Sequence, residues 1–387
     1  MKRLGRLTVC ILSLIWAGRA LSSAAPQNLI DQASAILRES PLIDGHNDLP
    51  WQYREKAALD LSKLDIRRPQ PALHTDIPRL RRGGVGGQFW SVYVPATMQG
   101  KEAVRATMEQ IDIVYQMAAR YPDTFEIART AADVERIFKA GKIASLIGME
   151  GGHSIDNSLG ALRMFYKLGA RYMTLTHGAN TPWADSATDK PEHHGLTPFG
   201  EAVVREMNRI GMLVDLSHTS PETMHAALRV TQSPVIFSHS SARAVNDHPR
   251  NVPDDVLAKI PANGGVVMVT FVPAFISAEV RQYDALPDEQ KRRQTAPRAT
   301  MAQVADHIDH IRRVAGINYI GIGSDFDGIT TVPQNLEDVS QYPGLVAELL
   351  RRGYSKDDVK KILGQNVLRV MRQVEQVAAR LQKVSPP

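Results

Sequence analysis

Short apolar runs alternate with longer amphipathic stretches along most of this chain. Eight of the apolar runs are bounded by turn residues, and most are followed by apolar residues at helical spacing. We expect strands at residues 41–46, 86–94, 144–149, 172–177, 213–218, 234–239, 265–271 and 319–325. Their nearly continuous apolar character is typical of parallel strands covered on both faces, and eight such strands can close a barrel.

The intervals between these runs have helical patterns at residues 102–120, 131–140, 159–168, 198–210, 221–230, 253–260 and 299–315. Regular alternation of strand and helix favours an α/β fold of the (β/α)8 TIM-barrel type over an open sheet. A helix near 28–40 and C-terminal helices within 343–382 fall outside the repeat, and we expect them to pack outside the barrel and stabilise it. The long polar segment 276–300 is either an active-site loop that acts as a lid or a solvated surface excursion.

The first 25 residues have the layout of a cleaved secretory signal peptide, with basic residues, an apolar stretch over 7–16 and small residues over 22–25. The rest, 26–387, is then expected to form one barrel domain. Residues 1–25 carry four of the 46 basic residues and none of the 41 acidic ones, so the formal net charge falls from +5 to +1 without them. A nearly neutral protein has no electrostatic attraction for nucleic acid or anionic membrane, and we expect neither as a partner.

Cys10 is the only cysteine and lies within the predicted signal peptide. The mature chain would therefore form no disulfide and offer no thiolate to a metal. It has no N-x-[ST] acceptor, and its polar C-terminal end does not resemble a lipid-anchor signal. We expect an exported bacterial protein, periplasmic or secreted, without a stable membrane anchor. A non-covalent homodimer stays open.

Six of the apolar runs end at a histidine or a carboxylate: LIDGHND, SLIGMEGG, YMTLTH, LVDLSH, PVIFSH and YIGIGSDFDG. The C-terminal ends of barrel strands meet at the active-site mouth, so these polar residues should converge although they are far apart in sequence. The residues concerned are His46, Asp48, Glu150, His177, His218, His239 and Asp325.

Five of these residues are metal ligands by type. His46 and Asp48 are two residues apart, so both side chains project to one side of an extended backbone. Glu150 precedes two glycines that permit a sharp turn, and His218 and His239 supply the imidazoles that suit zinc. A single residue of this kind is more often structural than a ligand, but five of them at equivalent strand ends indicate a metal site.

One catalytic zinc takes ~3 protein ligands. Five candidates that include one bridging carboxylate therefore predict two divalent ions, Zn²⁺ favoured, about 3.5–4 Å apart. Such a pair activates a bridging water as hydroxide and polarises a carbonyl.

Three further residues are candidates for handling the substrate. Asp325 is placed to move a proton from the attacking water to the leaving amine, a role for which Asp327 competes. His177 is a candidate donor to the developing oxyanion. Arg250 follows the sixth strand and could bind a carboxylate in bidentate fashion. The alternative is that Arg243 and Arg250 simply form surface ion pairs with nearby acidic residues.

These motifs resemble the membrane dipeptidase (renal dipeptidase) family of dinuclear zinc peptidases. DGHNDLP, GMEGGH, TLTHGANTPW, DLSH, PVIFSHSSA, HPRNVPDDVL and GSDFDG match in order and approximate spacing over nearly the whole chain after the predicted signal peptide. The resemblance implies an amidohydrolase-type barrel in which His46, Asp48 and Glu150 bind one ion. Glu150 would bridge to a second ion held by His218 and His239.

The resemblance also implies substrate contacts from His177, Arg250 and Asp325, with Asp325 as the proton carrier. The implied reaction is hydrolysis of dipeptides, with tolerance for a D-residue at the C-terminal position and opening of some β-lactam rings. Animal members carry disulfides and a lipid anchor. We expect neither here, which argues against membrane attachment and against a disulfide-linked dimer. Two other functions stay open: another barrel amidohydrolase, such as a deaminase or lactonase, which Arg250 argues against, and a non-catalytic binding protein, which the complete ligand set argues against.

Overall fold

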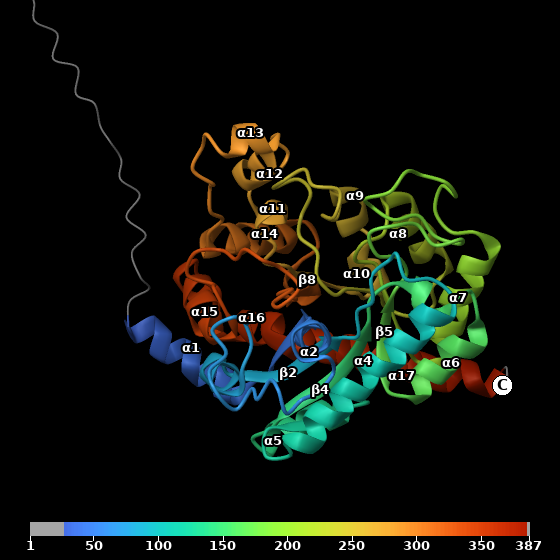
Figure 1. The fold of residues 1–387 in the computed structure, drawn as a ribbon, viewed down its shortest axis with the longest axis horizontal. Coiled ribbons are helices and arrows are strands. Elements are labelled where there is room, and N and C mark those ends of the chain that lie inside the picture. The colour runs from blue at the N-terminus through green and yellow to red at the C-terminus, as the bar shows by residue number, and fades with distance from the viewer. Residues whose placement is uncertain (1–26, 385–387) are drawn as a thin grey trace, which may run out of the picture.

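Eight parallel strands close into a barrel in the computed structural model, which describes residues 27–384 (Figure 1). The barrel strands are β1 (Leu42–Asn47), β2 (Val85–Ser91), β4 (Ile143–Met149), β5 (Ala170–Thr174), β6 (Leu213–Asp215), β7 (Ile236–Phe237), β8 (Val266–Val269) and β9 (Ile320–Ile322). They are hydrogen-bonded in the order β2-β1-β9-β8-β7-β6-β5-β4, and a direct β2–β4 pairing closes the ring. The predicted (β/α)8 barrel is therefore confirmed.

A ninth strand, β3 (Phe125–Ile127), lies outside the predicted set. It pairs with the first residues of β4, over 143–145, whereas β5 pairs with the end of β4 over 147–149. Three residues are too few for a periodic pattern to stand out from a loop. The strand widens the sheet at the start of β4 and does not take part in closing the barrel.

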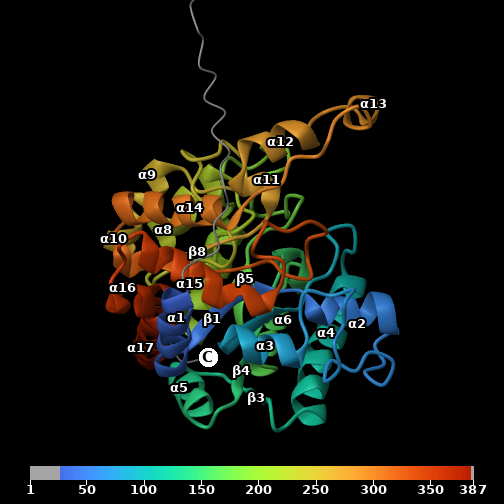
Figure 2. The same cartoon turned by 90° about the vertical axis from the view of Figure 1, so that its left-hand side faces the viewer.

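Helices surround the barrel and join its strands (Figures 1 and 2). Those up to the seventh barrel strand are α1 (Gln27–Glu39), α2 (Leu49–Ala57), α3 (Ile77–Gly83), α4 (Lys101–Arg120), α5 (Ala131–Lys139), α6 (Leu159–Lys167), α7 (Pro198–Ile210), α8 (Pro221–Val230), α9 (Asp254–Leu257) and α10 (Ile260–Asn263). Those that follow are α11 (Pro273–Ile276), α12 (Ala278–Asp284), α13 (Asp288–Lys291), α14 (Met301–Val314), α15 (Tyr342–Arg351), α16 (Lys356–Lys360) and α17 (Asn366–Val384).

Most predicted helices are present, with two differences. The pattern over 253–260 forms two short helices, α9 and α10, because Pro261 cannot continue a helix from the preceding turn. Helices α2 and α3 have no counterpart in the prediction; each is short and carries a proline in its first turn. Helix α2 follows β1 and α3 precedes β2, so both lie in the connection between these two strands and the alternation of strands and helices is kept.

The polar segment 276–300 contains helices α12 and α13, which lie at the outer edge of the molecule in both views (Figures 1 and 2). Its role as a lid stays a prediction. The predicted signal peptide, 1–25, lies outside the described residues. Within 27–384, no helix is long and apolar enough to span a membrane.

The C-terminal helix α17 packs against the barrel itself. Its Val367, Val370 and Met371 belong to one apolar cluster with Ile43 of β1 and Met268 of β8. All five side chains are at most 3% exposed. The tail is therefore part of the barrel core.

Candidate metal centre

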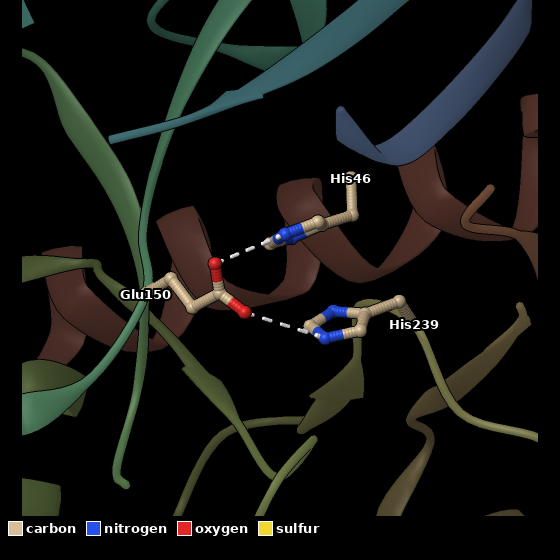
Figure 3. Close-up of side chains that lie close together, drawn as sticks. All are labelled: His46, Glu150 and His239. Atoms are coloured by element: carbon tan, nitrogen blue, oxygen red, sulfur yellow. Dashed lines mark ion pairs between the residues drawn. The ribbon is translucent and has the colours of Figure 1, made fainter. Parts of the chain in front are cut away.

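The strand ends bring the predicted ligands together around Glu150, which directly follows β4 (Figure 3). His46 lies in β1 and Asp48 just beyond it, while His218 follows β6 and His239 follows β7. All five side chains are buried or nearly so, with His46 fully inaccessible and Glu150 5% exposed. Residues separated by almost 200 positions in the sequence thus share one small volume.

The two oxygens of Glu150 face different partners, as Figure 3 shows for His46 and His239. Oε2 lies 3.2 Å from His46 Nε2, which is itself 3.3 Å from Asp48 Oδ2. Oε1 lies 3.0 Å from His218 Nε2 and 3.5 Å from His239 Nε2. The carboxylate therefore separates two sets of donor atoms, which is the arrangement that a bridging ligand requires.

Glu150 reaches this position because the backbone turns sharply after it. Gly151 has φ 101°, and a Cβ there would lie 2.4 Å from the His153 ring. A Cβ on Gly152 would lie 2.5 Å from the Leu175 carbonyl oxygen. The predicted role of this glycine pair in the turn is thus supported by both conformation and space.

The spacing of the donor atoms fits a divalent cation. Two atoms bound to one tetrahedral Zn²⁺ lie roughly 3.3 Å apart, given bonds of about 2.0–2.1 Å. The Glu150 separations above match this value, and His218 Nε2 and His239 Nε2 are 2.9 Å apart. Within the described chain, His46 Nε2 and Asp48 Oδ1 are buried without a hydrogen-bond partner. A metal ion would satisfy both atoms.

The charge states of these groups also suit metal binding. Burial opposes ionisation of Glu150, yet His46, His218 and His177 hold its pKa well below the usual range, so it is a carboxylate. Burial, with Arg250 and neighbouring histidines, keeps the pKa values of His218 and His239 well below normal, so both imidazoles are neutral. Neutral imidazole and ionised carboxylate are the forms that bind metals.

His46 differs from the other two histidines. Burial disfavours its charged form, but Tyr172, Glu150 and Asp48 together raise its pKa well above normal. The two carboxylates therefore favour a positive charge at this position. A bound cation would supply that charge and leave the imidazole neutral.

A cavity of about 740 Å³ opens beside this cluster at the C-terminal end of the barrel. Its wall includes six of the predicted site residues: Asp48, Glu150, His177, His218, Arg250 and Asp325. His46 and His239 lie just behind that wall, in contact with Glu150. The structure thus brings all eight predicted residues to one place, whereas their individual roles stay predictions.

Arg250 is buried, with 3% exposure, and its guanidinium lies over the Phe275 ring at 5.2 Å. Burial lowers its pKa to about 10, so the group stays charged at neutral pH. Its hydrogen bonds are long, 3.4 Å to Ser240 Oγ and 3.5 Å to the His239 carbonyl. No carboxylate of the described residues lies within 4.0 Å of it, so the predicted alternative of a surface ion pair does not apply.

Asp325 faces the same cavity from the loop after β9. Burial, reinforced by Asp48 and Glu150, raises its pKa well above normal even though His46 and Arg250 oppose the shift. Its backbone has φ 68°, a left-handed conformation that costs about 1 kcal/mol or more in a residue other than glycine. A raised pKa makes this carboxyl hold a proton more readily than an ordinary aspartate does, which suits a group that must accept and return one.

His177 stands at the edge of the ligand cluster. Its Nε2 is 3.7 Å from Glu150 Oε1, and its ring lies 4.4 Å from that of His218 and 5.0 Å from that of Tyr93. Glu150, His177 and His218 could together hold an ion, as could His46, Asp48 and Asp325. Geometry therefore permits His177 and Asp325 as ligands as well as substrate contacts.

The sequence model of the membrane dipeptidase family (peptidase family M19) matches residues 30–385 of this chain. The chain belongs to the membrane dipeptidase family. It is 46% identical over 365 residues to dipeptidase verJ of Clonostachys rogersoniana, covering 92% of this chain and 89% of that protein. It is 47% identical over 364 residues to dipeptidase 3 of Rattus norvegicus, covering 92% of this chain and 70% of that protein.

Solved structures are also similar to this chain. A metallopeptidase from Rhodobacter sphaeroides, liganded with a phosphinate mimic of the dipeptide L-Ala-D-Ala, aligns with a TM-score of 0.76 and 26% identity, covering 87% of this chain and 99% of that chain. As a member of the membrane dipeptidase family, the protein is a metal-dependent hydrolase of peptide bonds. The deaminase, lactonase and non-catalytic alternatives are therefore set aside.

For a membrane dipeptidase, several cavity residues went unrecognised in the sequence: Trp51, His74, Tyr93 and Phe275. Three of them lie in helices or a loop with no strand end to mark them, and only Tyr93, within the predicted run 86–94, carried a positional signal. Asp327, the predicted competitor of Asp325, also lines the cavity, and its carboxylate accepts a hydrogen bond from the His74 backbone at 2.7 Å.

Proposed function

We propose that this membrane dipeptidase relative binds two divalent ions, Zn²⁺ favoured, and hydrolyses dipeptides that have a free C-terminal carboxylate. The observation that carries the proposal is Arg250, a buried charged group on the cavity wall without a carboxylate partner among the described residues. Asp325, Glu150 and Asp215 act on this charge only from a distance, so the buried guanidinium has no direct ion pair, and a substrate carboxylate would provide one.

Ions held by the Glu150 cluster would lower the pKa of a bound water and polarise the peptide carbonyl. Arg250 would orient the substrate by binding its carboxylate, so that the peptide bond lies over the cluster. Asp325 would take the proton from the attacking water and deliver it to the leaving amine. His177 would donate a hydrogen bond to the carbonyl oxygen as negative charge develops there.

The proposal extends to a D-residue at the C-terminal position. The similar Rhodobacter sphaeroides metallopeptidase is liganded with a mimic of L-Ala-D-Ala, which supports this tolerance. We further propose that some β-lactams are opened, because many β-lactams place a carboxylate near the scissile amide and so present the same pair of groups. Export after removal of residues 1–25 and a non-covalent homodimer stay predictions.

The decisive experiment is to purify the protein, count bound metal and assay L,L and L,D dipeptides before and after chelation. We expect two ions per chain and cleavage that chelator abolishes and added Zn²⁺ restores. Each dipeptide is compared with its C-terminal amide, and we expect the amide to be a poor substrate. Fewer than two ions with chelator-insensitive cleavage, or equal cleavage of acid and amide, would contradict the proposal.

A further inference from the structure

Two buried aspartates hold equivalent places in the barrel, one on each side of the metal cluster. Asp44 in β1 accepts a hydrogen bond from the His46 backbone N–H at 3.2 Å, and Asp215 in β6 accepts one from the Ser217 N–H at 3.1 Å. Each aspartate is thus bonded by the residue two positions later. Both carboxylates are completely inaccessible to solvent.

Each aspartate also holds a serine that follows the neighbouring strand. Asp44 accepts the backbone N–H of Ser324 at 2.8 Å and its hydroxyl at 2.6 Å. Asp215 accepts the backbone N–H of Ser238 at 2.8 Å and its hydroxyl at 2.6 Å. The same clamp therefore occurs twice, between β1 and β9 and between β6 and β7.

The two clamps differ in what the serine oxygen contacts next. Ser324 Oγ also lies 3.1 Å from the His46 carbonyl oxygen, so the hydrogen bonds that start at Asp44 lead to a backbone atom. Ser238 Oγ lies 2.8 Å from Nδ1 of His239, a predicted metal ligand. Only the second clamp thus connects a buried carboxylate to an imidazole ring.

The position of each proton follows from these contacts. A carboxylate only accepts, so the Ser238 hydroxyl must donate its single proton to Asp215. Ser238 Oγ can then only accept from His239, which places the ring proton on Nδ1. His239 Nε2 is left with a free lone pair that faces Glu150 and His218.

We propose that Asp215, acting through Ser238, holds His239 in the Nδ1-protonated tautomer and so makes Nε2 available to a divalent cation. Asp215 is a positioning residue, since it touches neither cation nor substrate. The inference rests on the proposed function, because it assigns a proton to one of the proposed ligands. Carboxylate–histidine pairs of this kind orient and strengthen metal ligands elsewhere; here a serine stands between the two groups.

His46 reaches the same tautomer by another route. Its Nδ1 lies 2.8 Å from the Tyr172 hydroxyl, which donates to the Gly45 carbonyl at 3.1 Å. The phenol oxygen is then free to accept the Nδ1 proton. Asp215 forms no hydrogen bond to Tyr172 or to the His46 ring and acts on Tyr172 only through its charge. A change at Asp215 should therefore weaken the ion bound by His239 far more than the ion bound by His46.

The substitution Asp215→Asn reverses the direction of donation along the hydrogen bonds from residue 215 through Ser238 to His239, while the side chain keeps its shape. Two backbone N–H groups, of Ser217 and Ser238, face one carboxylate oxygen and will select the amide oxygen of asparagine. The amide NH₂ then faces Ser238 Oγ and donates to it. The serine hydroxyl turns to donate to His239 Nδ1, which forces the ring proton onto Nε2, where it blocks the metal.

The matched control is Asp44→Asn. It replaces an equally buried carboxylate with the same backbone and serine contacts, and each carboxylate accepts one more hydroxyl, from Tyr342 on Asp44 at 2.7 Å and from Thr174 on Asp215 at 2.6 Å. The reversed Ser324 hydroxyl donates to the His46 carbonyl and meets no ring. Zinc affinities of full-length wild type, D215N and D44N are measured by chelator competition, with cobalt spectra as a second readout. We expect one of two ions to bind about 10–100-fold more weakly in D215N, and both to bind normally in D44N. Equal losses in the two variants, or normal binding in D215N, would overturn the inference.

Two further measurements keep the inference testable if D215N does not fold. Ser238→Ala removes the connection without reversing it, so it should weaken the same ion less than D215N. The ¹⁵N spectrum of histidine-labelled, metal-free wild type should show a protonated Nδ1 and a bare Nε2 in His239; a protonated Nε2 would overturn the assignment. Wild type that binds no metal but has this tautomer would contradict the proposed function and leave the assignment standing.

Discussion

Each end of the barrel carries a cavity, and the larger of the two lies at the strand starts, away from the predicted metal ligands. The cavity at the strand starts has a volume of about 910 Å³, compared with about 740 Å³ at the mouth. No histidine, aspartate or glutamate of the described residues lines the larger one, whereas the smaller one is lined by five carboxylates and three histidines. Volume therefore does not locate the site; convergence of strand ends does.

Two arginines make the difference concrete. Arg369, at the strand starts, donates to the backbone carbonyls of Gly264, Gly265 and Asn318. Arg250, at the mouth, has only two long contacts. Both terminal nitrogens of Arg369 are thus bound by the protein, although its buried Nε has no partner, whereas the Arg250 guanidinium retains donors on the cavity wall. The comparison teaches that the mouth combines terminal guanidinium nitrogens open to a ligand with carboxylates and histidines, which the wall of the other cavity lacks among the described residues.

The largest effect should come from Glu150→Gln. Loss of the bridging charge should release metal and lower kcat/KM by about 10⁴-fold, because both water activation and carbonyl polarisation are lost. Activity and metal content are measured together. Arg380→Ala, on the wall of the other cavity, is the control, and an equal loss there would break the contrast between the ends.

Asp325→Asn should retain metal and lower kcat by about 10³-fold, the range of general acid–base catalysis. The carboxamide preserves the shape of the side chain but cannot carry the proton. Metal content by atomic absorption and steady-state kinetics give the two readouts. Loss of metal instead would make Asp325 a ligand, as its proximity to His46 and Asp48 permits.

Arg250→Met should lower kcat/KM for a dipeptide by about 10²-fold, the value of a desolvated, charge-assisted contact. The same change should leave cleavage of the dipeptide amide almost unaffected, because the amide lacks the carboxylate. Arg369→Met at the opposite end is the matched control and should leave KM unaltered in the folded protein. Equal losses for acid and amide substrates would mean that Arg250 acts on the fold.

The smallest effect concerns stability at the mouth. His307 is fully buried, where its Nδ1 accepts from Ala242 N–H at 3.1 Å and its Nε2 lies 3.3 Å from the Ile276 carbonyl oxygen. Burial lowers its pKa from 6.5 to about 4, so the unfolded chain binds a proton at higher pH than the folded one. The contribution of neutral His307 to the free energy of unfolding is thus complete above pH 6.5 and is lost as the pH falls toward 4.

Between pH 7 and 5 this one group should lower the free energy of unfolding by about 2 kcal/mol. Urea unfolding at both pH values measures the difference. His307→Gln keeps a donor and an acceptor but does not titrate, so its stability should change less over this interval than that of wild type. Identical pH dependence in the two proteins would remove His307 as the cause.

The part of the site that could be predicted is the part at strand ends. His46, Glu150, His218 and His239 follow apolar runs, and the topology of a parallel barrel then places them together. His74 could not be found in this way, because its loop reaches the cavity only through tertiary packing. Asp44 and Asp215 did carry a signal, a charge inside an apolar run, but its meaning depends on serines of other strands.

The same limit applies to the fold. Eight strands were predictable because each is a buried apolar run, whereas β3 and α3 are too short to produce a period. Helix α2 begins directly after Asp48, so its start coincides with residues that the pattern assigns to the metal site. Where one segment both begins a helix and supplies a predicted metal ligand, the hydrophobic pattern alone does not show where the helix starts.

The packing of α17 onto the barrel has a consequence for how the protein is made. All barrel strands precede α17, so the ribosome completes them before Val367, Val370 and Met371 can cover Ile43 and Met268. A nascent chain therefore exposes the base of its barrel until the end of synthesis, when domains are most open to misassembly. Chaperones that bind during translation should find their apolar target there.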